Sequence, residues 1–125
     1  MLTWPPTVRV FLCTRPTDMR RSFDGLAAIT RDLLGEDPLS GHLFVFFNRR
    51  SDRVKILFWD RSGYCLYYKR LEKGTFRLPK QTSTRCGLET DMSQLSLILE
   101  GIDLSSAKRH KRFIRAADKT GRHIA

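Results

Sequence analysis

Basic and aromatic side chains alternate in the middle of the sequence, a combination that suits nucleic-acid binding. Guanidinium and ammonium groups contact phosphates, and aromatic rings stack on bases. The candidate phosphate-binding residues are Arg49, Arg50, Arg53, Lys55, Lys69 and Arg70. Between the two lysines lie the aromatic residues Phe58, Trp59, Tyr64, Tyr67 and Tyr68. The pattern therefore favours a polyanionic partner.

The same aromatic residues also have a purely structural interpretation. Aromatic side chains in strands usually belong to the core, because they bury a large apolar area and pair across strands. We assign Phe58 to the core on this basis. Tyrosine and tryptophan are also frequent at interfaces, so Trp59 and Tyr67 are candidate residues of an interface with a protein partner.

No recognisable catalytic motif accompanies these residues. The acidic residues are scattered and resemble caps and turns, whereas metal-assisted chemistry needs converging carboxylates. There is no phosphate-binding glycine loop followed by a lysine, and no nucleophile-elbow motif. The histidines stand apart and the three cysteines are widely spaced, so neither a zinc site nor a disulfide framework is expected. We therefore predict a protein without enzymatic activity, metal site or cofactor.

The composition is that of a basic globular protein. The chain has 125 residues, 41% of them hydrophobic and 29% charged, with a formal net charge of +10. This length fits one domain with a real core. Residues 41–80 carry a net charge of +7, and residues 107–125 carry +6. No apolar run is long enough for a membrane helix and no secretory signal is recognisable, so we expect no membrane partner and a cytoplasmic location.

The first part of the chain predicts a strand followed by a helix. The β-branched and apolar run of residues 8–13 is typical of a short strand. Asp18 is a suitable N-cap for a helix over residues 19–34. Gly25 within that helix predicts a close approach to another backbone. The apolar stripe of the helix consists of Met19, Phe23, Leu26, Ile29 and Leu33.

The rest of the chain predicts a small sheet and a second helix. Three strands, over residues 43–47, 54–59 and 64–69, are joined by polar turns and form an antiparallel meander. Residues 75–78 are a candidate fourth strand and residues 80–90 a loop. Asp91 caps a second amphipathic helix that ends at Gly101.

These elements predict an α+β fold in one domain. A small antiparallel β-meander sheet packs against the N-terminal amphipathic helix and the second, C-terminal helix. The compact domain covers residues 1–104, and residues 105–125 form a basic tail. The tail is either helical in part or disordered until it meets a partner. Its candidate nucleic-acid contacts are Lys108, Arg109, Lys111, Arg112 and Arg115.

Antiparallel pairing places the six candidate cations of the meander at one end of the sheet. The turn at residues 48–52 and the far ends of the second and third strands meet there, whereas Arg61 lies at the opposite end. Both faces of the sheet are partly apolar. We expect the helices to cover one face, and a partner, a second copy or the C-terminal segment to cover the other.

Several segments, in order, resemble one known family. Residues 17–26 read TDMRRSFDGL and are similar to the "DMRKSFDGL" signature of a small TnpB-type accessory protein of bacterial insertion sequence 66 elements. This protein is the product of the second open reading frame and is unrelated to the RNA-guided nuclease of the same name. The resemblance continues over residues 37–46 and 49–50, and it is strongest over residues 52–60, 63–72 and 74–76. Residues 99–103, LEGID, resemble the closing "LLEGID" of the family.

The resemblance implies a role in transposition, with strand transfer carried out by a separate, larger transposase. It assigns no catalytic or binding residue by motif. Our first hypothesis is a non-catalytic accessory factor that binds DNA, at the transposon ends, through the basic sheet end and the tail. The alternative is a protein–protein adaptor that docks on the transposase through Trp59 and Tyr67. A third hypothesis, an enzyme, would require a role for Asp52 or Asp60.

Overall fold

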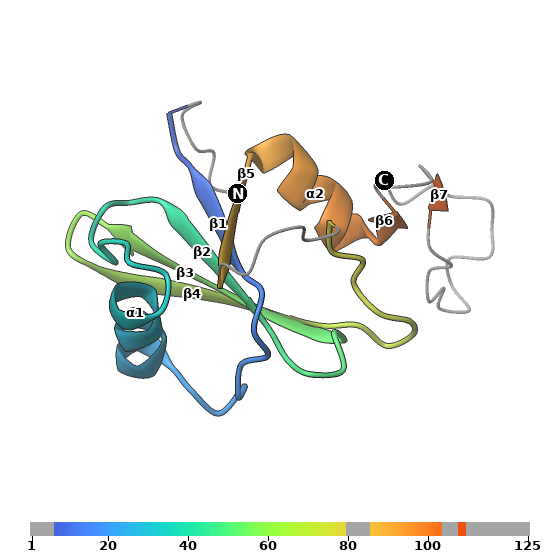
Figure 1. Ribbon diagram of the computed structural model, residues 1–125, viewed down its shortest axis with the longest axis horizontal. Helices are drawn as coiled ribbons and strands as arrows, with labels where there is room; N and C mark the ends of the chain where they lie inside the picture. Colours follow the sequence, from blue (N-terminus) through green and yellow to red (C-terminus); the bar gives the residue numbers. More distant parts are fainter. Residues whose placement is uncertain (1–6, 80–85, 104–107, 110–125) are drawn as a thin grey trace.

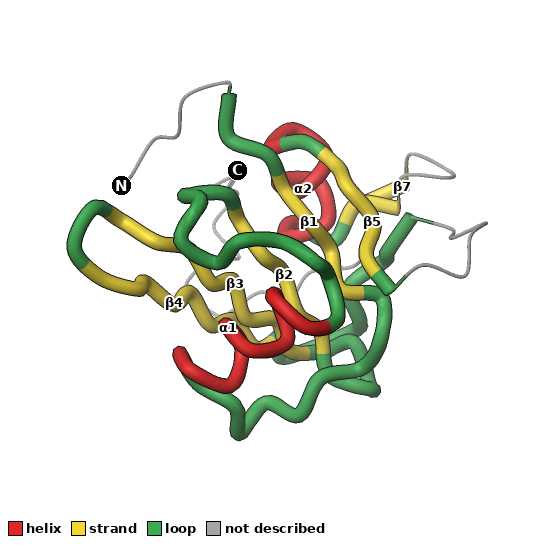
Figure 2. The backbone as a smooth tube through the Cα atoms, turned by 60° about the vertical axis from the view of Figure 1, so that its left-hand side comes forward, coloured by secondary structure: helices red, strands yellow, loops and turns green. Residues whose placement is uncertain are grey.

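A five-stranded mixed sheet forms the centre of the computed structural model, which describes residues 7–79, 86–103 and 108–109. Its strands are β1 (Val10–Cys13), β2 (Leu43–Phe47), β3 (Arg53–Asp60), β4 (Gly63–Arg70) and β5 (Gly87–Thr90). They lie side by side in the order β4-β3-β2-β1-β5 (Figure 2). The helices are α1 (Phe23–Asp32) and α2 (Met92–Glu100), and the short strands β6 (Ile102–Asp103) and β7 (Lys108–Arg109) form a separate pair.

The predicted meander is present as β2, β3 and β4. Both connections are antiparallel, with Val45 opposite Ile56 and Ile56 opposite Tyr67. The β3–β4 pairing runs without interruption from Asp60 opposite Gly63 to Arg53 opposite Arg70. Because the register has no bulge, alternate residues of β3 and β4 point to opposite faces along their whole length.

The sheet is larger than the predicted meander, and it is mixed. β1 pairs parallel to β2, with α1 in the connection between them, and β5 pairs antiparallel to the other edge of β1. The prediction of a loop over residues 80–90 is therefore wrong at residues 87–90. At Gly87 a Cβ atom would lie 2.9 Å from Leu34 Cδ2, so the absence of a side chain lets this strand approach the core.

The predicted fourth strand at residues 75–78 is also incorrect. Phe76 lies in a loop and is buried, with its ring edge-on to that of Phe47. Its backbone N–H donates to the Ser51 carbonyl at 2.6 Å. The inserted ring and this hydrogen bond help to hold the segment, and the apolar run reflects packing rather than a strand ladder.

Helix α1 begins at Phe23, four residues later than predicted, and its N-cap is Ser22 rather than Asp18. The Asp18 carboxylate accepts from the Arg20 backbone N–H at 2.9 Å and so stabilises a turn before the helix. Phe23 is 42% exposed, although the predicted stripe included it. The neighbour of Gly25 is the Arg21 side chain and not another backbone.

Helix α2 agrees with its predicted caps. The Asp91 side chain accepts from the backbone N–H of Gln94 at 2.8 Å. Gly101 ends the helix in the left-handed conformation, with φ of 80°, which glycine adopts without steric cost. The Gln94 side chain bonds the Thr90 hydroxyl, so it links α2 to the end of β5.

One helix covers each face of the sheet (Figure 1). On one face Leu26 of α1 packs with Phe44 and Leu57. On the other face Leu95 of α2 packs with Ile56. The expectation that both helices share a face, leaving the other to a partner, is therefore wrong. We refer below to the α1 face and the α2 face.

Candidate nucleic-acid interface

The turn between β2 and β3 presents two arginines on a rigid support. Asn48 organises this turn, because its side-chain oxygen accepts from the backbone N–H groups of Asp52 and Arg53 at 3.1 and 3.0 Å. Its amide nitrogen donates to the Asp52 carboxylate at 2.6 Å. Arg49 and Arg50 lie between these anchored residues and are exposed. The network therefore fixes the backbone that carries both guanidinium groups.

Arg53 and Arg70 continue this basic surface along the sheet. They lie directly opposite each other across β3 and β4. Arg53 borders a shallow depression of about 340 Å³ together with Arg49 and Arg50. It also borders a second depression, of about 430 Å³, together with Arg70 and Tyr68. The two depressions therefore adjoin at Arg53, and we call Arg49, Arg50, Arg53 and Arg70 the arginine surface.

The arginine surface carries more positive than negative charge. Arg70 makes an ion pair with Glu72, with the Nη2–Oε1 distance 3.1 Å. The acidic side chains of the described residues form no ion pair with Arg49, Arg50 or Arg53. Like charges directly across a strand pair destabilise a sheet, so an anion bound between Arg53 and Arg70 would relieve their repulsion.

Lys55 and Lys69, which the sequence placed in the same cluster, have different surroundings. Lys55 is only 7% exposed, and its Nζ donates to the carbonyls of Met19 and Arg21 at 2.7 and 2.8 Å. Lys69 is half-buried on the α2 face and donates to the Leu99 carbonyl at 2.9 Å. The Lys55 ammonium thus bonds the segment that precedes α1 and the Lys69 ammonium bonds the last turn of α2, and neither belongs to the arginine surface.

The aromatic residues also divide between the two faces. Tyr67 is 44% exposed and borders the apolar groove beneath α2. Trp59 is half-buried near the β3–β4 turn, where its ring packs edge-on against Tyr64 with the centroids 5.1 Å apart. Phe58 is buried as predicted. Trp59 and Tyr67 alternate onto opposite faces of the sheet and therefore do not form one continuous patch.

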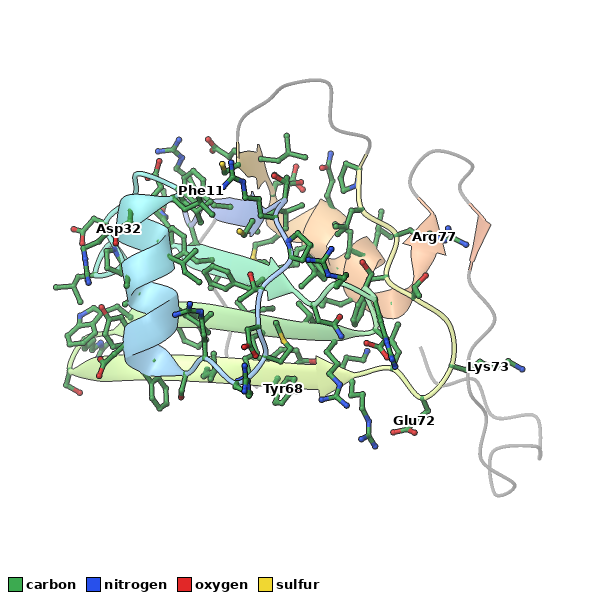
Figure 3. All side chains as sticks on the ribbon, turned by 60° about the horizontal axis from the view of Figure 1, so that its bottom comes forward. Phe11, Asp32, Tyr68, Glu72, Lys73 and Arg77 are labelled. Carbon is green, nitrogen blue, oxygen red and sulfur yellow. The ribbon has the colours of Figure 1, made fainter. Side chains whose placement is uncertain are left out.

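Tyr68 borders the arginine surface, and it is one of the aromatic residues that the sequence interleaves with the candidate cations, although the interface candidates predicted from the sequence are Trp59 and Tyr67. Tyr68 is 49% exposed, and its hydroxyl accepts from Arg53 Nη1 at 3.3 Å. Figure 3 shows its side chain beside β4, with Glu72 in the loop that follows. The strand period of two contained the signal, because it places Tyr68 on the face of Arg70 and Tyr67 on the opposite face.

Two other arginines, Arg20 and Arg9, are each compensated by a carboxylate. The Asp18 carboxylate accepts hydrogen bonds from two side-chain nitrogens of Arg20, and these bonds lower the pKa of Asp18 from 3.8 to about 2. The carboxylate therefore stays ionised at neutral pH and offsets the Arg20 charge. Just before β1, Arg9 is paired with Glu89 at 2.6 Å. These two pairs add no net positive charge to the molecule.

Potential metal ligands are not clustered in the described part of the chain, and His42 and Cys13 have structural surroundings. Within residues 7–79, 86–103 and 108–109, no three metal-ligating side chains converge. His42 accepts the Arg9 backbone N–H on Nδ1 at 2.9 Å, as expected for a polar residue at a strand end. Burial raises the pKa of the Cys13 thiol, which disfavours the reactive thiolate.

Two of the five predicted tail contacts, Lys108 and Arg109, lie within the described residues. Lys108 and Arg109 form β7, whose backbone pairs with β6. Lys111, Arg112 and Arg115 lie outside the described residues.

Neither α1 nor α2 has the length and apolar character of a membrane-spanning helix.

Comparison with known proteins identifies relatives over most of this fold. A family model described as "IS66 Orf2 like protein" matches residues 8–109. The uncharacterized protein y4jC of Sinorhizobium fredii is 36% identical over 102 residues, which cover 82% of this chain and 86% of that protein. The uncharacterized protein y4hO of the same organism is 39% identical over 103 residues, covering 82% and 88%. No solved structure gives a significant match.

Proposed function

This chain belongs to the IS66 Orf2-like family of insertion-sequence accessory proteins, and from that premise we propose that it assists transposition by binding DNA. The contacts are made by the arginine surface to phosphate oxygens, with the basic C-terminal tail adding further attraction. In this proposal the chain itself is not an enzyme, and a separate transposase of the same element carries out strand transfer.

The observation that supports this proposal is the gathering of four arginines around two adjoining depressions, where Arg49, Arg50 and Arg53 form no ion pair with the acidic side chains of the described residues. Arg49 and Arg50 occupy a turn whose backbone Asn48 fixes, and Arg53 joins them to Arg70. Guanidinium groups bind phosphate in a bidentate geometry. Contacts of this type fix position on DNA and carry no base information, so we propose binding with little sequence preference of its own.

A salt titration of the full chain on a duplex from an element end tests this proposal. Each phosphate contact contributes about 0.9 to the slope of log affinity against log salt concentration. Four arginine contacts therefore give a slope of about −3.5, and tail contacts make it steeper. We expect the double variant R49A/R50A to make the slope shallower by about 2 and to weaken binding equally on a scrambled duplex.

A charge-matched control distinguishes local contacts from the general field of a basic protein. Arg31, near the end of α1, and Arg61, in the β3–β4 turn, are exposed and lie at the opposite end of the sheet. The variant R31A/R61A removes the same charge and should leave the slope within about 0.5 of the original. If both double variants lose DNA affinity equally, or if the original chain does not bind at low salt, the arginine surface is not the DNA-binding site.

The adaptor hypothesis receives less support, because Trp59 and Tyr67 lie on opposite faces of the sheet. It would gain support from capture of the purified transposase that survives nuclease treatment and is unchanged by R49A/R50A. Capture that disappears with either treatment favours an association through DNA.

A further inference from the structure

Tyr68 has a defined position within the arginine surface. The Lys55 ammonium lies over one face of its ring, 4.7 Å from the centroid. That ammonium is itself held by the carbonyls of Met19 and Arg21. Arg53 bonds the phenolic oxygen at the ring edge. The ring is therefore held on one face and at its edge, while 49% of the residue remains exposed.

We propose that Tyr68 is a stacking platform for an unpaired nucleobase, so that this surface takes single-stranded DNA in preference to duplex. The proposal rests on the proposed function and specifies its substrate class. The exposed face of the ring takes the base, while Arg53 and Arg70 contact the phosphates on either side of that nucleotide. No covalent step is involved.

Three features favour a base over an apolar protein side chain as the occupant. Arg53 and Arg70 border the same depression as the ring, and their charge suits a phosphodiester backbone. Stacking on an aromatic ring is available to every base, but only when that base is unpaired. An ammonium behind the ring also offsets the negative potential of the aromatic face, which favours stacking by bases with electron-rich faces.

The neighbouring tyrosine provides a matched control. Tyr67 has similar exposure, 44% against 49%, but lies on the α2 face, away from Arg53 and Arg70. The variants Y68A and Y67A therefore remove the same ring from adjacent positions on opposite sides of one strand. Y68L keeps apolar bulk without the aromatic system, and Y68F keeps the ring without the hydroxyl.

The experiment compares the affinity of the full chain for a labelled oligothymidine and for a duplex of equal length. We expect Y68A and Y68L to weaken single-strand binding by roughly 5- to 150-fold, the range that corresponds to the loss of one stacked base. Y68F and Y67A should stay within about 2-fold of the original protein, and duplex affinity should change little in all four variants. Because stacking neutralises no phosphate, the salt slope should be unchanged in Y68A.

The outcomes separate this inference from the function on which it rests. The stacking role of Tyr68 is wrong if Y68A and Y67A weaken single-strand binding equally. It is also wrong if Y68L binds the single strand as tightly as the original protein. If duplex binding still depends on Arg49 and Arg50 in that case, the proposed function stands without the stacking role of Tyr68. If the chain binds neither the oligothymidine nor the duplex at low salt, both proposals are wrong.

Discussion

At the scale of single residues, the structure separates cations that the sequence makes look equivalent. Arg53 and Lys55 lie two positions apart on one strand and point to the same face. Arg53 reaches the surface and contacts Tyr68, whereas Lys55 is buried beneath the same ring. The difference follows from acceptors that only the folded chain provides, the carbonyls of Met19 and Arg21.

We therefore expect the variant K55M to lose stability. Methionine keeps most of the apolar stem but leaves two carbonyls without the charged donor. Hydrogen bonds to charged groups contribute about 1.5–3 kcal/mol, so the free energy of unfolding should fall by about 2–4 kcal/mol in a urea titration. K73M, at an exposed loop position, should change it by less than about 0.5 kcal/mol.

The opposite result would assign Lys55 to the interface. If K55M unfolds at the same urea concentration as the original chain but loses DNA affinity with a shallower salt slope, then its ammonium contacts phosphate. The sequence-based grouping of six cations would in that case be correct for Lys55.

At the scale of elements, local signals predicted what local interactions determine. Residues 43–47, 54–59 and 64–69 are rich in apolar and aromatic residues and joined by short turns, and β2, β3 and β4 follow them closely. Asp91 and Gly101 likewise mark the ends of α2. The capping bond of Asp91 and the left-handed backbone of Gly101 involve only residues within one helical turn, so the sequence alone predicts them.

Long-range partners determine the elements that sequence reasoning missed. The strand β5 has the sequence Gly-Leu-Glu-Thr, without a clear β pattern, and exists because β1 offers it an edge. The late start of α1 reflects Asp18 bonding Arg20 and Lys55 bonding two nearby carbonyls. In the candidate site, the strand period predicted which arginines meet but not which cations are buried.

A stability test of α2 belongs to this scale. The N-cap bond of Asp91 to Gln94 N–H satisfies a helix-end donor, and such caps contribute about 1 kcal/mol. We expect D91A to lower the free energy of unfolding by about that amount. S93A, at an exposed position in the first turn of the same helix, should be neutral within about 0.5 kcal/mol. Equal effects of the two variants would contradict the capping role.

At the scale of the whole molecule, two cores on either side of one sheet depend on both halves of the chain. α2 contributes the buried residues Leu95 and Ile98 to the α2 face, and β5 completes the edge of β1. Each fully buried aliphatic side chain contributes about 1.5–3 kcal/mol, whereas the net stability of a domain is only about 5–15 kcal/mol. Loss of these two side chains alone therefore costs about 3–6 kcal/mol, a large part of that stability, and loss of β5 adds to the cost.

Truncation tests this dependence. A chain that ends at Pro79 lacks β5 and α2, and we expect it to show no cooperative unfolding transition by circular dichroism. A chain that ends at Arg109 keeps all the described elements and should unfold cooperatively. A sharp transition in the shorter chain would show that the first four strands and α1 suffice for folding.

The position of β5 also has a consequence during translation. The ribosome releases residues 10–13 early and residues 87–90 late, yet these two strands are neighbours in the sheet. Until the later strand emerges, the nascent polypeptide carries an open edge on β1, which other extended chains can join. Synthesis in quantity therefore favours aggregation of unfinished chains, and a chaperone that shields this edge should raise the yield of native protein.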